Sequence, residues 1–270
     1  MSISAKLLSM HSSFGLIILM ATFVVLTMVG FLIARRFMPA NLLPSHNNIV
    51  GYIFSTLSVI YAVLLGFAIF MVWQQYENTE TSAALEAEES LALYRDLSLY
   101  PSPESTAPII ETLVLYVRSV IDEEYPMMMR KQRSKTTDDA FRDLWTRFGV
   151  LDPRESREQI LYSQILTDMH NMARSRTNRL QAAEDELPDM IWLTLIFGAM
   201  VTVGCTFFFC PDHVKAHLLL TCLLAAVLAS VWFVIMGLDH PFLGWASIKS
   251  GYFQRALEVI MERRCILTLP

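Results

Sequence analysis

The sequence is short of charged residues. Asp, Glu, Lys and Arg make up 17% of its 270 residues, and hydrophobic residues make up 54%. An ordinary soluble domain carries roughly 25% charged residues. The shortage is concentrated in four long runs that contain none of these four residue types. A composition of this kind predicts a membrane protein.

Each of the four runs is long enough to cross a membrane. A helix needs roughly 20 residues to span a hydrocarbon core of about 30 Å. The runs lack the alternation of barrel strands, so helices are expected. The apolar part of the first run exceeds that of a signal peptide, and Arg35 and Arg36 follow it, so we expect an uncleaved span. The predicted spans are Phe14–Ile33, Ile49–Trp73, Met190–Cys210 and His217–Leu238.

Cysteines and catalytic motifs are also scarce. The four cysteines form no CxxC pair, which argues against a disulfide framework or a zinc site. There is no Gly-rich phosphate loop, HExxH or GxSxG, and the spans hold no charged side chain for proton transfer. We expect no enzyme, no catalytic residue and no cofactor. His213 and His217 are helix neighbours beside Asp212, but interfacial histidines are commoner than metal ligands, so no metal site is expected.

Charge is unevenly spread along the chain. Residues 74–189 hold 13 Lys and Arg against 22 Asp and Glu, a net charge of -9, whereas the remainder has a net charge of +4. A mildly basic membrane part therefore carries an acidic insert. Nucleic acid is not an expected partner, because phosphate binding needs a basic face.

The insert is predicted to be helical. No helix breaker interrupts Gln74–Leu99, so the second span should continue as a helix beyond the membrane. Ser102 and Pro103 form a helix start, followed by apolar residues at helical spacing. Asp152–Glu155 is read as a second start, with Asp152 as the cap. Arg130–Thr137 is the expected surface loop, and Glu155–Pro188 is expected to lead into the third span.

An even number of spans places both termini and the insert on one side. The balance of Lys and Arg near the span ends favours the cytoplasm for that side, in an inner (plasma) membrane of a bacterium. The predicted architecture is all-α: a four-span transmembrane helical bundle with a helical cytoplasmic insert. Its parts are residues 1–73 (spans one and two), 74–189 (insert), 190–238 (spans three and four) and 239–270 (cytoplasmic tail).

The second span has one face of small and hydroxyl side chains. Two interpretations stay open: close helix packing, for which small residues are suited, and a pore lining in an oligomer, with Phe54 and Ile69 as constriction candidates. In a pore, Glu77 and Glu80 would form acidic rings that favour cations. At 100° per residue the face comprises Gly51, Ser55, Ser58, Ala62, Gly66, Trp73, Glu77 and Glu80.

Two charged clusters of the insert lie at similar distances from the membrane. If their helices pack antiparallel, acids and arginines come level and form an ion-pair network; the alternative is a solvated charged face. Asp239 follows the fourth span, and since an acid is unfavourable at a helix C-terminus, we expect Arg174, Arg176 or Arg179 to pair with it. The network candidates are Glu86, Glu88, Glu89, Arg95, Arg174, Arg176, Arg179 and Asp239.

Several short motifs together resemble one known family. They are YAVLLGF at Tyr61–Phe67, Glu86-Ala87 with Leu93–Arg95 downstream, the segment Arg176–Leu180, and DHPFLG at Asp239–Gly244. In their order and spacing they resemble the bestrophin-like membrane proteins of bacteria and plants, over about residues 47–260.

The resemblance implies a four-span subunit of a homo-oligomer, a pentamer as in bestrophins, whose second span lines a pore for inorganic ions. Bestrophins conduct anions, which the acids at Glu77 and Glu80 disfavour, so the sign of the permeant ion stays open. Asp239 stands alone where a calcium-activated bestrophin carries a run of acids, so calcium gating is not implied. The alternative function is a non-conducting scaffold in the lipid bilayer whose acidic insert docks a cytoplasmic partner.

Overall fold

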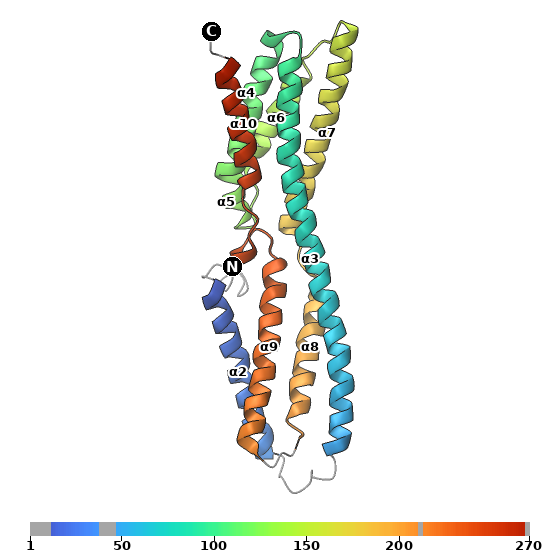
Figure 1. Cartoon of the computed structure of the whole chain (residues 1–270), viewed down its shortest axis with the longest axis vertical. Helices are drawn as coiled ribbons and strands as arrows, with labels where there is room; N and C mark the ends of the chain where they lie inside the picture. Colours follow the sequence, from blue (N-terminus) through green and yellow to red (C-terminus); the bar gives the residue numbers. More distant parts are fainter. Residues whose placement is uncertain (1–11, 38–46, 210–212, 268–270) are drawn as a thin grey trace. The chain divides into compact units, whose positions relative to one another are not determined.

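The structure, a computed structural model, describes residues 12–37, 47–209 and 213–267. The described residues form helices and loops, and no strand occurs among them. The chain divides into two compact units. We name Met1–Tyr76 with Glu186–Ala246 the span unit, and Glu77–Asp185 with Ser247–Pro270 the insert unit. Figure 1 labels the helices of both units and colours them in sequence order.

The span unit contains the four apolar helices that the sequence predicts. They are α2 (Ser12–Phe37), the first part of α3 (Asn47–Leu99), α8 (Asp189–Thr206) and α9 (Val214–Leu238). All four are long and apolar enough to cross a membrane. The third span is shorter than expected because α8 ends at Thr206, and Cys210 lies outside the described residues. A short 3₁₀ turn, η4 (Gly244–Ala246), follows α9.

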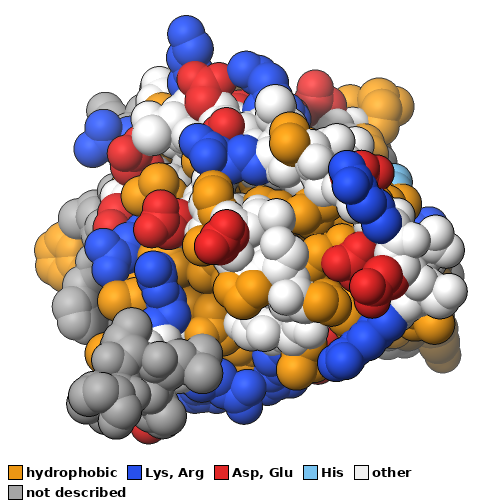
Figure 2. All heavy atoms as spheres, turned by 90° about the horizontal axis from the view of Figure 1, so that it is seen from above, with side chains coloured by type: hydrophobic (Ala, Val, Ile, Leu, Met, Phe, Trp, Pro, Cys, Tyr) orange, Lys and Arg blue, Asp and Glu red, His pale blue; other side chains and the backbone are white. Residues whose placement is uncertain are grey.

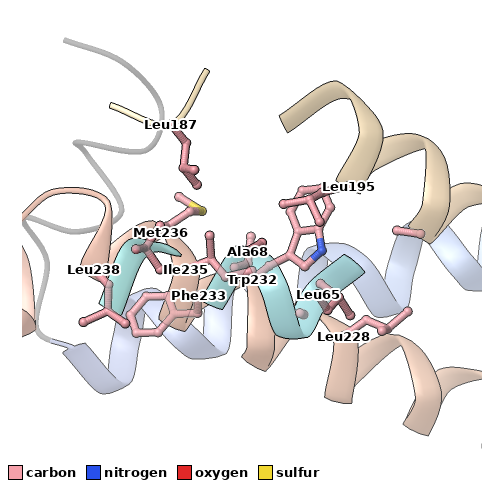
Figure 3. Close-up of a cluster of buried hydrophobic side chains, with 14 of the residues drawn as sticks. Leu65, Ala68, Leu187, Leu195, Leu228, Trp232, Phe233, Ile235, Met236 and Leu238 are labelled. Carbon is pink, nitrogen blue, oxygen red and sulfur yellow. The ribbon is translucent and has the colours of Figure 1, made fainter. Parts of the chain in front are cut away.

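One face of α3 belongs to the core of the span unit. Tyr61, Leu65, Ala68 and Val72 recur at helical spacing and are buried, where they pack with side chains of α8 and α9 (Figure 3). The helix α2 packs along α9. Because lipid tails are as apolar as these side chains, close packing and hydrogen bonds, rather than the hydrophobic effect, hold such helices together.

A chain of hydrogen bonds crosses this core. The indole Nε1 of Trp232 donates to the hydroxyl of Tyr61 at 3.1 Å, and that hydroxyl donates to the carbonyl oxygen of Leu195 at 3.1 Å. The two bonds join α9 to α3 and α3 to α8. They fix the Tyr61 ring in front of Gly198, whose missing side chain leaves the room that the ring occupies.

The insert unit is built from the second part of α3 and six further helical segments. They are α4 (Pro103–Ser119), η3 (Val120–Glu124), α5 (Tyr125–Met128), α6 (Lys135–Phe148), α7 (Ser156–Glu184) and α10 (Gly251–Leu267). Two expectations are confirmed: α3 runs without a break to Leu99, and α4 begins at Pro103. Within this unit α3 and α7 lie side by side (Figure 1).

Three boundaries of the insert differ from the sequence prediction. The start of α7 is at Ser156, because Glu155 rather than Asp152 is its cap and exchanges hydrogen bonds with Glu158. The loop after α5 is shorter than Arg130–Thr137, because the Ser134 hydroxyl caps α6 by accepting a bond from the Thr137 N–H at 3.2 Å. The helix α7 ends at Glu184, and an extended stretch up to Pro188 separates it from α8.

The surface of the insert unit carries charges of both signs. Acidic and basic side chains are interspersed with small apolar patches on the face seen in Figure 2. Several of them pair on exposed positions, among them Arg147 with Asp143 at 2.8 Å and Arg133 with Glu184 at 2.7 Å. Exposed pairs of this kind contribute only about 0–1 kcal/mol each, so the stability of this unit has to come from its interior.

Candidate functional site

The small-residue face of α3 lies beside the face that enters the core. Ser55, Ala62, Gly66, Trp73 and Glu77 are exposed. A Cβ atom added to Gly66 would meet nothing within 4 Å among residues 12–37, 47–209 and 213–267, so these residues leave this side of the helix open. The three remaining members of the predicted face, Gly51, Ser58 and Glu80, are half-buried.

The two constriction candidates have contacts within their own chain. The ring of Phe54 packs edge-on against Phe209, with centroids 5.9 Å apart, and Phe54 is half-buried. Ile69 is partly buried and packs against the core of the span unit. Both side chains therefore turn partly away from the open face of α3.

The acids at the end of this face differ in their surroundings. Glu77 is exposed. Glu80 is half-buried, and its carboxylate accepts a hydrogen bond from the Tyr252 hydroxyl of α10 at 3.0 Å. This bond raises the pKa of Tyr252. Of the two, Glu77 is the acid whose charge is the more open to solvent.

The insert unit encloses a buried cluster of charges centred on Arg179. Its guanidinium donates from Nε to Glu86 Oε2 at 2.7 Å, and from Nη2 to Glu86 Oε1 at 2.9 Å and to Glu124 Oε2 at 2.6 Å. The side chains of all three residues have 0% exposure. The two-bond geometry toward Glu86 is the arrangement in which arginine holds a carboxylate most strongly.

A second guanidinium, that of Arg176, closes the cluster on its other side. It donates to both oxygens of Glu124, at 2.8 and 2.7 Å, and to Asp138 Oδ1 at 2.7 Å. Asp138 is partly exposed, with 39% of its side chain accessible, whereas Arg176 is buried. Glu124 thus bridges two arginines that lie three residues apart on α7.

Aromatic rings enclose both guanidinium groups. Arg179 lies over Tyr125 and Phe253, at 5.5 and 5.4 Å from the ring centroids. Arg176 lies over Tyr116 and Phe141, at 5.5 and 5.3 Å. Such cation–π contacts contribute about 2 kcal/mol or more where water is excluded. Phe253 comes from α10, so the C-terminal helix forms part of the enclosure.

Burial and pairing decide the ionisation of the cluster. Burial opposes the negative charge of Glu124, but Arg179 and Arg176 outweigh it and lower the pKa of that carboxyl. Burial, with the charge of Glu86, raises the pKa of Tyr116 well above its usual value, and the Tyr116 hydroxyl donates a hydrogen bond to Glu86. The cluster therefore holds an ionised Glu124 and a neutral Tyr116 beside its two arginines.

Glu124 reaches this position through an irregular turn. Residues Val120–Glu124 form a π-helical segment in which the Tyr125 N–H bonds to the Val120 carbonyl. Pro126 follows directly, and since proline has no N–H it cannot donate to the carbonyl one turn earlier. The wider turn has a local cause in the sequence, and such turns are frequent at functional sites.

The cluster joins some of the network candidates and leaves others outside. Glu86, Arg176 and Arg179 are in it, whereas Glu88, Arg95 and Arg174 are exposed and Glu89 is half-buried. Sequence reasoning missed three members, namely Glu124, Asp138 and Tyr116. The signal that could have found Glu124 is the Pro126 that follows an otherwise unbroken helical pattern.

The predicted arginine partner of Asp239 stays a prediction. The described contacts of Arg176 and Arg179 are with acids and rings of the insert unit, and Arg174 is exposed. Asp239 accepts a hydrogen bond at Oδ1 from the backbone N–H of Leu187 at 2.7 Å, and its Oδ2 lies 3.7 Å from Nδ1 of His240. The acid at the end of α9 thus holds the stretch that leads into α8.

Of the two histidines at the other end of α9, His217 is engaged in packing, whereas His213 is exposed. Nε2 of His217 lies 2.9 Å from the Thr206 carbonyl oxygen, and its ring packs against Phe31. Among residues 12–37, 47–209 and 213–267, no group of three or more possible metal ligands occurs. Asp212 lies outside these residues.

Comparisons with known proteins agree on one family. A sequence model of the Bestrophin-like domain matches residues 21–253. None of the curated proteins matches this chain. Solved structures of the same fold include a variant of a bacterial bestrophin homologue from Klebsiella pneumoniae, with 13% identity, a TM-score of 0.69, and coverage of 92% of this chain and 98% of that one.

Two further structures have the same fold. A second variant of the Klebsiella pneumoniae homologue is 15% identical, with a TM-score of 0.68 and coverage of 92% of this chain and 96% of that one. A structure described as a membrane protein variant is 14% identical, with a TM-score of 0.66 and coverage of 92% and 97%. At these identities the likeness is one of fold.

Proposed function

This chain belongs to the bestrophin-like family, and from that premise we propose that it is a subunit of an oligomeric ion channel whose pore is lined by the first part of α3. The assembly would be a homo-oligomer, with five subunits by analogy with bestrophins. It would sit in a bacterial inner membrane, with its termini and the insert unit on the cytoplasmic side.

The observation that carries this proposal is the open face of α3. Small and hydroxyl side chains line it from Ser55 to Gly66, and nothing in the described part of the chain lies within 4 Å of a Cβ atom added to Gly66. The neighbouring face of the same helix holds the core of the span unit. In an oligomer, a helix anchored on one side and lined with small polar groups on the next is suited to face water.

The acids that follow Trp73 on α3 bear on the ion selectivity of the proposed pore. Exposed Glu77 and half-buried Glu80 follow Trp73 on the same face. Acidic rings favour cations, whereas the bestrophin resemblance implies anions. The sign of the permeant ion is therefore the first property to measure.

The buried charge cluster is proposed to support the pore helix. Glu86 lies on α3 and is held by Arg179 of α7 through two hydrogen bonds. An ion pathway needs access to solvent, and the side chains of Glu86, Glu124 and Arg179 have none. Its role is thus to fix α3 in the insert unit.

The decisive experiment is planar-bilayer recording of the purified oligomer under a KCl gradient. Discrete currents would support the channel, and the sign of the reversal potential would give the charge of the permeant ion. Glu77→Gln should shift the reversal potential toward the value expected for anion permeation. The control Glu104→Gln replaces an exposed acid of α4 and should leave the reversal potential unchanged.

Two results would contradict the proposal. An equal reversal potential for wild type and Glu77→Gln would remove this acid from the pore. The absence of currents over the full voltage range, with a folded oligomer verified in the bilayer, would favour the alternative: a membrane scaffold whose acidic insert docks a cytoplasmic partner.

A further inference from the structure

A second buried acid lies between α3 and α7, outside the charge cluster. The side chain of Asp168 on α7 is buried, with 5% of the residue exposed. Its Oδ1 accepts a hydrogen bond from the Gln164 amide at 3.0 Å. Its Oδ2 is buried and receives no hydrogen bond from a donor among the residues that the structure describes, and its hydrogen-bonding neighbour is the carboxyl of Asp96. A carboxylate oxygen in that position is unfavourable unless it carries a proton.

The packing of the two helices brings Asp96 of α3 to this acid. Glu86 faces Arg179, and the Ser90 hydroxyl donates to the Met172 sulfur at 3.2 Å. The helices therefore run antiparallel, and six residues further along α3 the same register places Asp96 level with Asp168. Asp96 is half-buried, and it is the charged group that acts most strongly on Asp168.

The charges that act most strongly on Asp168 are acidic. Asp96 and Glu89 approach from α3, and the neighbour on α7 itself is the neutral Gln164. Burial and then the charge of Asp96 raise the pKa of Asp168 to about 6. Two acids that share a site cannot both ionise freely.

We propose that Asp96 and Asp168 share a proton in mildly acidic solution, and that losing this proton loosens the packing of α3 against α7. With the proton in place, one acid donates to the other and the buried Oδ2 is satisfied. Without it, two negative charges and Glu89 face one another in a partly dry contact. The proposal does not depend on whether the protein conducts ions.

The direction of the pH effect follows from the raised pKa of Asp168, which is about 6 in the folded chain against an ordinary value of 3.8. Between these values the folded state binds a proton that the unfolded state does not. The contribution of the pair to stability is therefore lost as pH rises from about 4 through 6, and it stays low at higher pH.

Hydrogen–deuterium exchange of the full-length protein in nanodiscs tests this inference. Peptides covering residues 90–100 and 160–172 are compared between wild type and Asp168→Asn at the same pH, so that intrinsic exchange rates and the titration of exposed His170 cancel. The ratio of wild-type to variant exchange should grow by about tenfold between pH 4.5 and 7.5. A ratio that is constant with pH would overturn the proposal.

Two further variants keep the test decisive. Asp96→Asn removes the like charge and should also show a pH-dependent ratio, of smaller size, and it carries the test if Asp168→Asn does not fold. If the ratio of wild-type to Asp96→Asn exchange stays at one at every pH, the sharing of the proton is overturned. Glu88→Gln, an exposed acid on α3, should leave the ratio at one throughout.

Discussion

The ring of Tyr61 occupies the space directly in front of Gly198. A Cβ atom at position 198 would come within 2.4 Å of Tyr61 Cδ2 and 2.6 Å of Cε2. The ring has little freedom to retreat, because its hydroxyl both donates to Leu195 and accepts from Trp232. This contact sets how closely α3 and α8 approach each other in the span unit.

The Gly198→Ala substitution should therefore destabilise the protein. We expect a loss of about 1–3 kcal/mol from overpacking, although alanine is the better helix former by about 1 kcal/mol. Unfolding in mixed detergent micelles measures the difference. Gly66→Ala is the matched control, because its added methyl group meets nothing within 4 Å. Equal stability of the two variants would contradict the tight contact.

Replacing Arg179 by Gln should destabilise the insert unit more strongly. The substitution leaves Glu86 and Glu124 buried with less compensation, and breaking a buried ion pair in this way costs about 3–5 kcal/mol. Limited proteolysis of the insert reports the loss. Arg174→Gln on the same helix is exposed and should change stability by less than about 0.5 kcal/mol. Comparable protease resistance of both variants would argue against a structural role for the cluster.

The insert unit should lose stability in strong acid. The pKa of Glu124 is lowered by Arg179 and Arg176 from an ordinary value of 4.5. A depressed pKa means that the contribution of Glu124 is present above pH 4.5 and is lost as pH falls through the lower, folded value. Protease resistance measured from pH 7 to pH 2.5 should show this loss. The control Glu184→Gln changes an exposed acid paired with Arg133. The pH at which half of the protease resistance is lost should be the same as in wild type. If this pH shifts in Glu184→Gln, surface ion pairs rather than Glu124 cause the loss.

Asp239 should stabilise the protein through its Oδ1 acceptor. Asp239→Ala removes the acceptor of the Leu187 N–H, and leaving a buried donor unpaired costs about 1–3 kcal/mol. Asp239→Asn retains an oxygen that can accept the same bond, so we expect a smaller loss. Thermal unfolding of the two variants in nanodiscs makes the comparison. If Asn proves as costly as Ala, a charged partner of Asp239 has to be sought.

The helices were predictable because they depend on local pattern. In a membrane protein, uncharged apolar runs of about 20 residues are expected to be membrane-spanning helices. All four predicted runs are helical in the structure. The continuation of α3 to Leu99 followed from the absence of breakers. The start of α7 was misplaced because Asp152 and Glu155 are both good caps, and only the reciprocal bonds with Glu158 select Glu155.

The partners of the charged side chains were less predictable, because they come from distant parts of the chain. Arg179 was expected near the acids after Trp73, and it does contact Glu86. Glu124 lies 55 positions before it, and Pro126 marks only an irregular turn there, not which residue Glu124 contacts. The bond between Asp239 and the Leu187 N–H was missed for a similar reason, since sequence patterns show side chains and not backbone donors.

The enclosure of Arg179 also has a consequence for the order in which its neighbours are synthesised. Its carboxylate partner Glu86 belongs to α3, whereas the ring of Phe253 that covers it belongs to α10, which is made after α3, α7 and α9. When the chain up to α9 has left the ribosome, the Arg179 guanidinium still lacks this ring. The insert unit therefore cannot close around Arg179 until α10 has been made.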